Sequence, residues 1–232
     1  MQPYFFPYLG YISLVKHTDL FILSDNVQFI RHGWIERNRV LKPNSGWLYI
    51  KVPLIKKEGG KTLIKDIQIN NRLPWKQKIL AQLQPYKNFA PHYQSVRELL
   101  NSLFAYEFDN IVSLNRAALM TVCQYLNIKT EIRIFTDMNL NIEKPSAPDE
   151  WSLNICRVLG NVDEYWNPPG GQEFYNSDKY EQANILLKFQ IMNILPYSQS
   201  RSEFEPSLSI IDVMMFNSIK EIHLMLDNYE LK

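Results

Sequence analysis

Short apolar runs separated by turn signals dominate the first part of the chain. Residues 9–16 have apolar positions at helical spacing, and the apolar run within 19–25 lies between two aspartates, as is typical of a buried strand. Residues 34–41 and 46–54 flank the turn signal KPNS and predict a β-hairpin. Apolar and polar residues alternate over 63–69, so we expect one more strand there.

From residue 74 onward the apolar positions take up helical spacing. Segments 74–87 and 90–105 each carry a proline near their start, where proline favours the first turn of a helix. The longest helical pattern covers 108–128. Three consecutive helices are therefore predicted in the middle of the chain.

The last part of the chain mixes the two patterns. The elements predicted there are strands at 131–138 and 185–191, a strand running into a tight loop at 163–175, and helices at 151–160 and 208–229. Gly160 ends the first of these helices, and the second, helical to its end, has a break near Asn217. This order favours an α/β or α+β domain over an all-α module. We expect a single domain over 1–232, in which 74–128 could form a helical subdomain.

Composition narrows the function classes. The chain has 232 residues and a net charge of +1, so no basic field indicates nucleic acid as a partner. Aromatic residues make up 13%, which suits a pocket lined with rings or, alternatively, an aromatic core. The two cysteines form no CxxC pair and the four histidines are scattered, so we expect no metal site and no cofactor. No apolar run reaches the length of a membrane span, and a reducing cytoplasm is the expected location.

The opening segment QPYFFPYLG is a rigid, aromatic loop that leads into the first predicted helix. Its two prolines restrict the backbone and lower the entropy of the loop. In open α/β sheets, ligands bind where loops join strand ends to helix N-termini. We therefore name Gln2, Tyr4 and Tyr8 as candidate ligand-binding residues. The alternative is a loop that its apolar side chains pack onto the core.

The densest polar stretch follows the predicted strand at 19–25. Asp25 stands at the end of this strand, where a carboxylate could act as a general base or bind a ribose. The candidate ligand-binding residues after it are Gln28, Trp34, Asn38 and Arg39. Arginine can hold a phosphate or a carboxylate through paired hydrogen bonds. A solvated hairpin face is the alternative for this stretch.

Two later segments add further candidates. In NPPGGQEFY the glycines allow close backbone approach and Gln172 follows them, although a structural turn explains the same residues. The segment 197–212 gathers polar side chains around a helix start, where Ser207 could also be only a cap. Its candidates are Tyr197, Gln199, Arg201 and Ser207 for binding and Asp212 for catalysis.

No established catalytic motif is present. The sequence contains no GxSxG elbow, no P-loop and no GxGxxG fingerprint. His92, in the segment APHY, is the one histidine that we consider as a catalytic base, and capping or packing is its alternative role. The catalytic candidates are thus Asp25, His92 and Asp212.

Motifs along nearly the whole chain resemble one family. QPYFFPYLGYISLV, DLFILSDNVQF, WIERNRV, WLYIKVP, NPPGGQEFY and EPSLSIIDVMMFN follow in this order between residue 2 and about residue 220, and together they resemble the WbqC-like protein family. The resemblance implies a protein of bacterial O-antigen or other surface-polysaccharide gene clusters. Two positions depart from the family pattern. Family members begin with a short apolar strand where Met1 stands here, and Glu36 replaces the asparagine of a WINRN pattern.

A weaker likeness concerns the fold. The order of strand, loop, short helix and strand is similar to that of nucleotidylyl-transfer Rossmann domains, but PYLGY retains only Gly10 and lacks the histidines of their motif. Adenylyl transfer by that route is therefore not supported. The fold class that we predict is α/β, with a Rossmann-like mixed sheet, a β-hairpin insertion and a helical segment.

These observations and the resemblance together lead to one preferred function. We expect a cytoplasmic enzyme of surface-polysaccharide biosynthesis that transfers an acyl or aminoacyl group to a nucleotide-linked amino sugar. Its partners would be a nucleotide sugar and an acyl or aminoacyl donor. The alternatives are a non-catalytic binding or scaffold protein of the same pathway and a nucleotide-dependent ligase.

Overall fold

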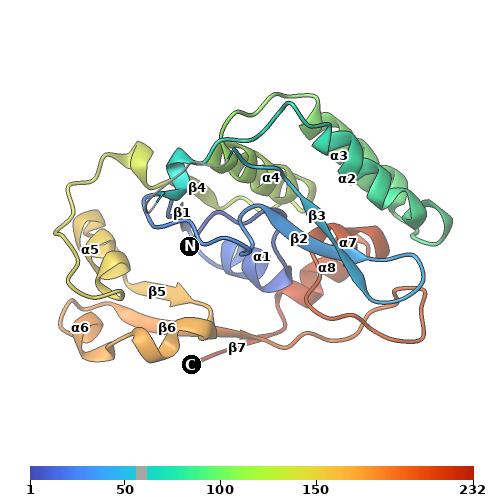
Figure 1. Ribbon diagram of the computed structural model, residues 1–232. Helices are drawn as coiled ribbons and strands as arrows, with labels where there is room; N and C mark the ends of the chain where they lie inside the picture. Colours follow the sequence, from blue (N-terminus) through green and yellow to red (C-terminus); the bar gives the residue numbers. More distant parts are fainter. Residues whose placement is uncertain (56–61) are drawn as a thin grey trace.

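A computed structural model describes residues 1–55 and 62–232 of the chain (Figure 1). The helices are α1 (Leu9–Lys16), α2 (Trp75–Leu83), α3 (Tyr93–Phe104), α4 (Ile111–Tyr125), α5 (Glu150–Leu159), α6 (Ser177–Glu181), α7 (Ile210–Phe216) and α8 (Ile219–Leu226). The strands are β1 (Leu20–Leu23), β2 (Arg37–Leu41), β3 (Trp47–Lys51), β4 (Glu131–Ile134), β5 (Glu164–Asn167), β6 (Leu186–Met192) and β7 (Tyr229–Leu231). Short 3₁₀ turns lie at Ile64–Asp66, Gln84–Asn88, Thr136–Met138 and Pro169–Phe174.

The strands form three small sheets, and the fold is mixed α/β. β1 pairs with β4 in parallel, β2 and β3 form the antiparallel hairpin, and β6 lies between parallel β5 and antiparallel β7. A Rossmann-like mixed sheet is not confirmed, because the strands of the described residues do not join into one sheet. The hairpin that we expected at 34–41 and 46–54 is confirmed.

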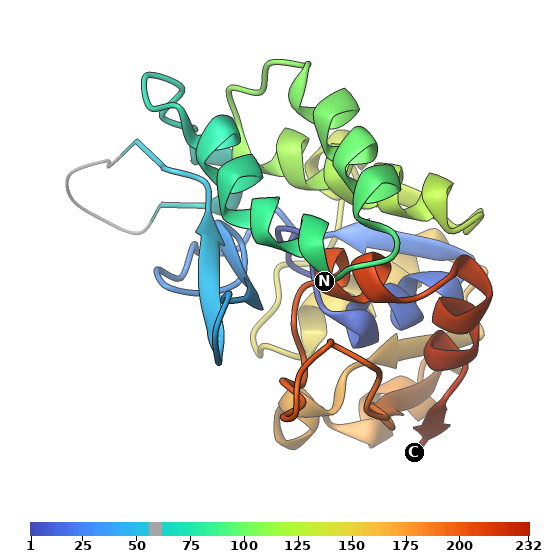
Figure 2. The same ribbon diagram turned by 90° about the vertical axis from the view of Figure 1, so that its right-hand side faces the viewer.

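The elements are stacked in three levels. Helices α2, α3 and α4 gather on one side of the molecule, and the sheet of β5, β6 and β7 with α5 and α6 lies on the opposite side (Figures 1 and 2). Helix α1 runs between these two levels (Figure 1). Helix α1 contacts α7, α8 and β6.

The opening loop begins beside β1. The backbone nitrogen of Met1 donates to the carbonyl of Ile22 at 2.8 Å, and the Ser24 amide donates to the carbonyl of Met1 at 2.7 Å. This alternation is the hydrogen-bond pattern of parallel strands. Met1 thus lies on the edge of β1 that β4 does not occupy, and the loop leaves from this edge.

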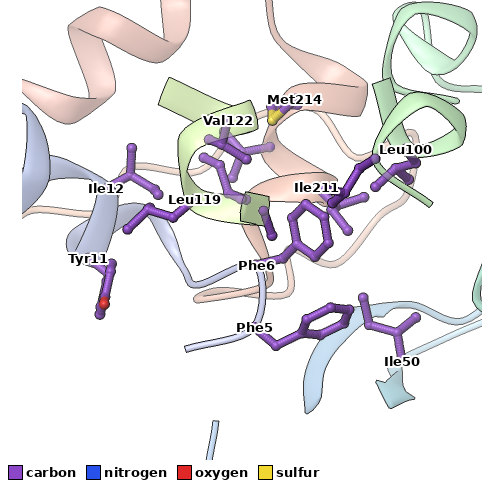
Figure 3. Packing of buried hydrophobic residues seen from close by; sticks show 14 of the residues in the cluster. Phe5, Phe6, Tyr11, Ile12, Ile50, Leu100, Leu119, Val122, Ile211 and Met214 are labelled. Atoms are coloured by element: carbon purple, nitrogen blue, oxygen red, sulfur yellow. The ribbon is translucent and has the colours of Figure 1, made fainter. Parts of the chain in front are cut away.

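Most buried apolar side chains belong to one core. The two phenylalanines of the opening loop are fully buried in it, with Phe5 directed toward Ile50 and Phe6 toward Ile211 and Leu119 (Figure 3). The buried residues of α2, α3 and α4 belong to the same core. A second, smaller core lies between α5, α6 and β6 and consists of Leu153, Cys156, Tyr180 and Ile185.

Two predictions of secondary structure were wrong. Residues 63–69 form no strand, because Ile64 and Ile67 bury their side chains from a 3₁₀ turn, in which positions three apart lie on one side. The chain is not helical to its end, since β7 follows α8 and pairs with β6. The break near Asn217 is confirmed, and so is the end of α5 at Gly160, which has a φ of 79°.

Candidate functional site

A cavity of about 410 Å³ lies where four segments distant in sequence meet. The opening loop and the first turns of α1 form one wall, and Trp34 together with residues of β2 forms another. The loop after β5 and the loop before α7 complete it. The lining residues are Met1, Tyr4, Pro7, Tyr8, Tyr11, Leu14, Trp34, Asn38, Arg39, Pro168, Pro169, Gly170 and Ser207.

Buried side chains hold the opening loop in its shape. The Asn38 side-chain amide donates to the carbonyls of Phe5 at 3.1 Å and Phe6 at 2.8 Å, and the Ser209 hydroxyl donates to Phe6 at 2.7 Å. Phe6 has a φ of 41°, a left-handed conformation that is uncommon for a bulky residue. The Asn115 amide donates to the Pro3 carbonyl at 2.8 Å. These bonds compensate the strain at Phe6 and fix the wall of the cavity.

Arg39 is the one charged side chain among the described lining residues. Its guanidinium carbon lies 5.5 Å from the ring of Trp34 and 5.2 Å from the ring of Trp47. One terminal nitrogen donates to the carbonyl of Ser207 at 3.1 Å, whereas Nε is buried without a hydrogen-bond partner. The flanking indoles hold the cation by cation–π attraction and keep it in the cavity wall.

Three tyrosines of the opening loop and α1 line the cavity. Burial raises the pKa of Tyr4, Tyr8 and Tyr11, so that their phenols stay neutral and can donate hydrogen bonds. The Tyr11 hydroxyl donates to the backbone carbonyl of Gln2 at 2.9 Å. The rings of Tyr4 and Tyr11 are 5.4 Å apart between centroids. This wall offers ring surfaces and hydroxyl groups but no charge.

The cavity is lined by six of the twelve binding residues that were predicted from the sequence. Those that line it are Tyr4, Tyr8, Trp34, Asn38, Arg39 and Ser207. The binding candidates outside its lining are Gln2, Gln28, Gln172, Tyr197, Gln199 and Arg201. Gln28 and Gln172 are exposed. Gln199 and Tyr197 instead contact Asp212.

Asp25 and His92 have partners within the protein and do not line the cavity. The buried carboxylate of Asp25 accepts from the Thr136 amide at 3.1 Å and from its hydroxyl at 2.5 Å. It thereby joins the end of β1 to the turn after β4. His92 precedes α3, and its backbone amide donates to the carbonyl of Met215 at 3.0 Å.

Asp212 lies at the centre of a separate buried cluster. Its two carboxylate oxygens accept from the hydroxyls of Tyr86 and Tyr197, each at 2.5 Å, and from the Gln199 amide at 3.2 Å. Loss of solvation outweighs these bonds and the nearby positive charge of Arg201, and raises the pKa of Asp212 to about 6. The cluster joins α7 to the loop before it, and Asp212 does not reach the cavity.

Several lining residues were not among the predicted site residues. Tyr11 and Leu14 are one helical turn apart on α1, and this spacing was the available signal for a common face. Pro168, Pro169 and Gly170 belong to the NPPGG motif, from which only the following Gln172 was named as a binding candidate. The motif thus reaches the cavity through its backbone and prolines.

Neither a metal-binding cluster nor a membrane-spanning helix occurs in the described part of the chain. Within residues 1–55 and 62–232 no three His, Cys, Asp or Glu side chains lie close enough together to hold a metal ion. Over the same ranges, none of the helices combines the length and the apolar character needed to cross a bilayer.

Sequence comparison connects the chain with other proteins. The model of the WbqC-like protein family matches residues 2–224. The uncharacterized protein Rv1507c of Mycobacterium tuberculosis (strain ATCC 25618 / H37Rv) is 27% identical over 219 residues, which cover 94% of this chain and 91% of the relative. No solved structure is significantly similar to the chain.

Proposed function

The chain belongs to the WbqC-like protein family, and from this premise we propose that its cavity binds a nucleotide-linked sugar in the cytoplasmic synthesis of a bacterial surface polysaccharide. Membership of the family supports an association with polysaccharide gene clusters. The cavity supports the binding of a small molecule, because its volume of about 410 Å³ suits a ligand of this size.

The surroundings of Arg39 are the observation that carries the proposal. A nucleotide-linked sugar combines a flat base, a sugar ring and a diphosphate. One cation in a wall of aromatic rings offers a partner for the diphosphate and ring faces for the base or the sugar. Neutral tyrosine hydroxyls can donate hydrogen bonds to sugar oxygens.

The reaction that we propose for this ligand is acyl or aminoacyl transfer to the sugar amine. The amine nitrogen attacks the carbonyl carbon of the donor, a C–N bond forms, the bond to the leaving group breaks, and the amine proton passes to solvent. None of the described lining residues is a carboxylic acid, histidine or cysteine. Catalysis here would therefore rest on positioning the two substrates rather than on a general base. The same observation favours a second candidate, binding without catalysis.

Binding is tested by titrating UDP-N-acetylglucosamine into the protein with calorimetric detection. We expect Arg39→Ala to weaken binding by about tenfold or more, because the diphosphate loses its cation. Arg37→Ala is the matched control, since Arg37 belongs to the same strand, packs over the ring of Tyr49 at 4.1 Å and does not line the cavity. Equal loss in both variants, or no binding by the wild type, would contradict the proposal.

Catalysis is tested separately by incubating the protein with UDP-glucosamine and acetyl-CoA and following N-acylation by mass spectrometry. A product that depends on the protein and on Arg39 supports the transferase. Binding of the nucleotide sugar without any product supports the non-catalytic candidate instead.

A further inference from the structure

We propose that Gly10 determines which ligands fit the cavity, because its missing side chain leaves the space that the ring of Tyr8 occupies. Gly10 itself does not line the cavity, whereas Tyr8 does. The inference rests on the proposed function, since it concerns the ligand of the same cavity. It makes Gly10 a positioning residue that acts through Tyr8.

The contact between these two residues is unusually close. A Cβ atom on Gly10 would lie 2.6 Å from both Cε2 and the hydroxyl oxygen of Tyr8, and 2.7 Å from its Cζ. Carbon atoms without a bond between them pack at about 3.5–4.0 Å. Any other residue at position 10 would therefore push the phenol end of Tyr8 away from α1.

The backbone does not explain the glycine. Gly10 lies in the first turn of α1 and its φ is not in the left-handed region, so alanine could adopt the same conformation. Alanine is also the better helix former. The space taken by Tyr8 is thus the one feature of this position that requires a residue without a side chain.

The backbone of Tyr8 cannot follow its ring. Tyr8 forms a bridge with Ser209, the carbonyl of Pro7 accepts from the Ile210 amide at 2.8 Å, and the carbonyl of Tyr8 accepts from the Tyr11 amide at 3.1 Å. The close contact between a Cβ atom at position 10 and the Tyr8 ring must therefore be relieved by rotation of the Tyr8 side chain. The cavity is the adjacent unfilled space, so the displaced ring enters it and reduces the room for the ligand.

The ligand group affected is the one that lies beside the tyrosine wall. A ring displaced into the cavity excludes the bulkier part of a nucleotide-linked sugar before it excludes a smaller molecule. Gly10 therefore allows the cavity to accept a ligand that fills its full depth. Overpacking of a close-packed site is costly even when the change is one methyl group.

The test combines ligand-free crystal structures with binding of UDP and UDP-N-acetylglucosamine. The variants are Gly10→Ala, Tyr8→Ala and the double variant. The control is Gly171→Ala, where the nearest atoms to an added Cβ are at 3.6 and 3.8 Å and nothing has to move. We expect Gly10→Ala to turn the Tyr8 ring into the cavity and to weaken binding of UDP-N-acetylglucosamine about tenfold, with a smaller effect on UDP. Gly171→Ala should stay within about twofold of the wild type.

In the Tyr8→Ala background, Gly10→Ala should have no further effect on binding, because the side chain through which it acts is gone. A Tyr8 ring that stays in position or turns away from the cavity would overturn the inference, as would equal weakening of both probes. If the wild type binds neither probe, the proposed function fails. In that case the ligand-free structures alone test the inference. A Tyr8 ring turned into the cavity in Gly10→Ala supports the role of Gly10 in setting the free volume of the cavity, and a ring in any other position overturns it.

Discussion

Asp212 carries a buried carboxyl group whose pKa the fold raises. The side chain is fully buried, and its pKa of about 6 lies above the ordinary value of 3.8 because burial disfavours the charge. The folded protein therefore binds more protons here than the unfolded chain between these two pH values. It follows that this group's contribution to stability is complete below pH 3.8 and declines as the pH rises through about 6.

Replacing the carboxyl group should remove this dependence. We expect Asp212→Asn to flatten the fall in unfolding free energy between about pH 4 and pH 7, a fall on the order of 2–3 kcal/mol in the wild type. Urea denaturation at several pH values measures it. Asp178→Asn serves as a control, because it removes the same charge from an exposed position. A profile in Asp212→Asn that is as steep as in the wild type would show that the slope comes from other groups.

At the residue scale, the sequence could predict side-chain type but not the partners of a side chain. Arg39 was predicted to bind an anion because of its guanidinium group, and it lines the cavity. Asp25 and Asp212 were chosen for a carboxyl group at the end of a predicted strand and near a predicted helix start, and His92 was chosen for its imidazole. Thr136, which donates two hydrogen bonds to Asp25, is distant from it in sequence, so no local pattern predicts this contact.

At the scale of elements, the opening loop depends on a strand rather than on its own sequence. Asn38 lies on the buried face of β2, while Arg37 and Arg39 take the other face, as the alternation of a strand requires. Its side chain donates to two consecutive loop carbonyls and accepts from the amide of Arg39 at 2.8 Å. Both groups of its side-chain amide are thus engaged within the protein, and Asn38 fixes the loop that lines the cavity.

Loss of this side chain should release the loop. We expect Asn38→Ala to lower the unfolding free energy by about 2–4 kcal/mol, because two buried carbonyls lose a donor and the strained Phe6 loses support. Asn38→Asp should be at least as damaging, since it turns an acceptor toward those carbonyls. Urea denaturation measures both, with Asn101→Ala on the exposed face of α3 as the control. A change no larger than in that control would contradict the assigned role.

Element boundaries with local signals were predictable, whereas the short strand β7, which is defined by its pairing alone, was not. The end of α5 needs a left-handed residue and has Gly160, and α8 begins directly after its N-cap residue Ser218, whose side chain forms a capping box with Glu221. Both boundaries can be derived from neighbouring residues. β7 has no such signal, because its three residues become a strand only by lying beside β6.

At the scale of the whole molecule, the cavity lies between the larger core and the elements around the smaller core, which are α5, α6 and β6. Tyr4, Tyr8 and Tyr11 pack on the larger core, whereas Pro168, Pro169 and Gly170 follow β5, next to the smaller core. The two parts must hold a constant relative position for the cavity to keep its shape. Sequence periodicity could indicate that α/β elements alternate, but it could not show that the strands divide among three sheets.

One buried serine joins these parts. The Ser13 hydroxyl on α1 donates to the carbonyl of Leu226 at the end of α8 at 2.5 Å, and it accepts from the side-chain amide of Gln190 on β6 at 3.0 Å. Ser13 and Gln190 are both buried, so water cannot replace these bonds. A single hydroxyl thus connects the central helix with the C-terminal helix and with the middle strand of the opposite sheet.

Removal of this hydroxyl should loosen one part of the molecule against the other. We expect Ser13→Ala to lower the unfolding free energy by about 2–3 kcal/mol, because a buried carbonyl and a buried amide lose their partner. Hydrogen exchange should accelerate in β6 and β7 more than in α3 and α4, since the lost bonds hold the sheet and not the helical level. Ser113→Ala is the matched control, as its hydroxyl donates to Asn110 at the exposed start of α4. Acceleration spread evenly over all elements would mean that the two cores unfold as one unit and that Ser13 contributes only to the common stability.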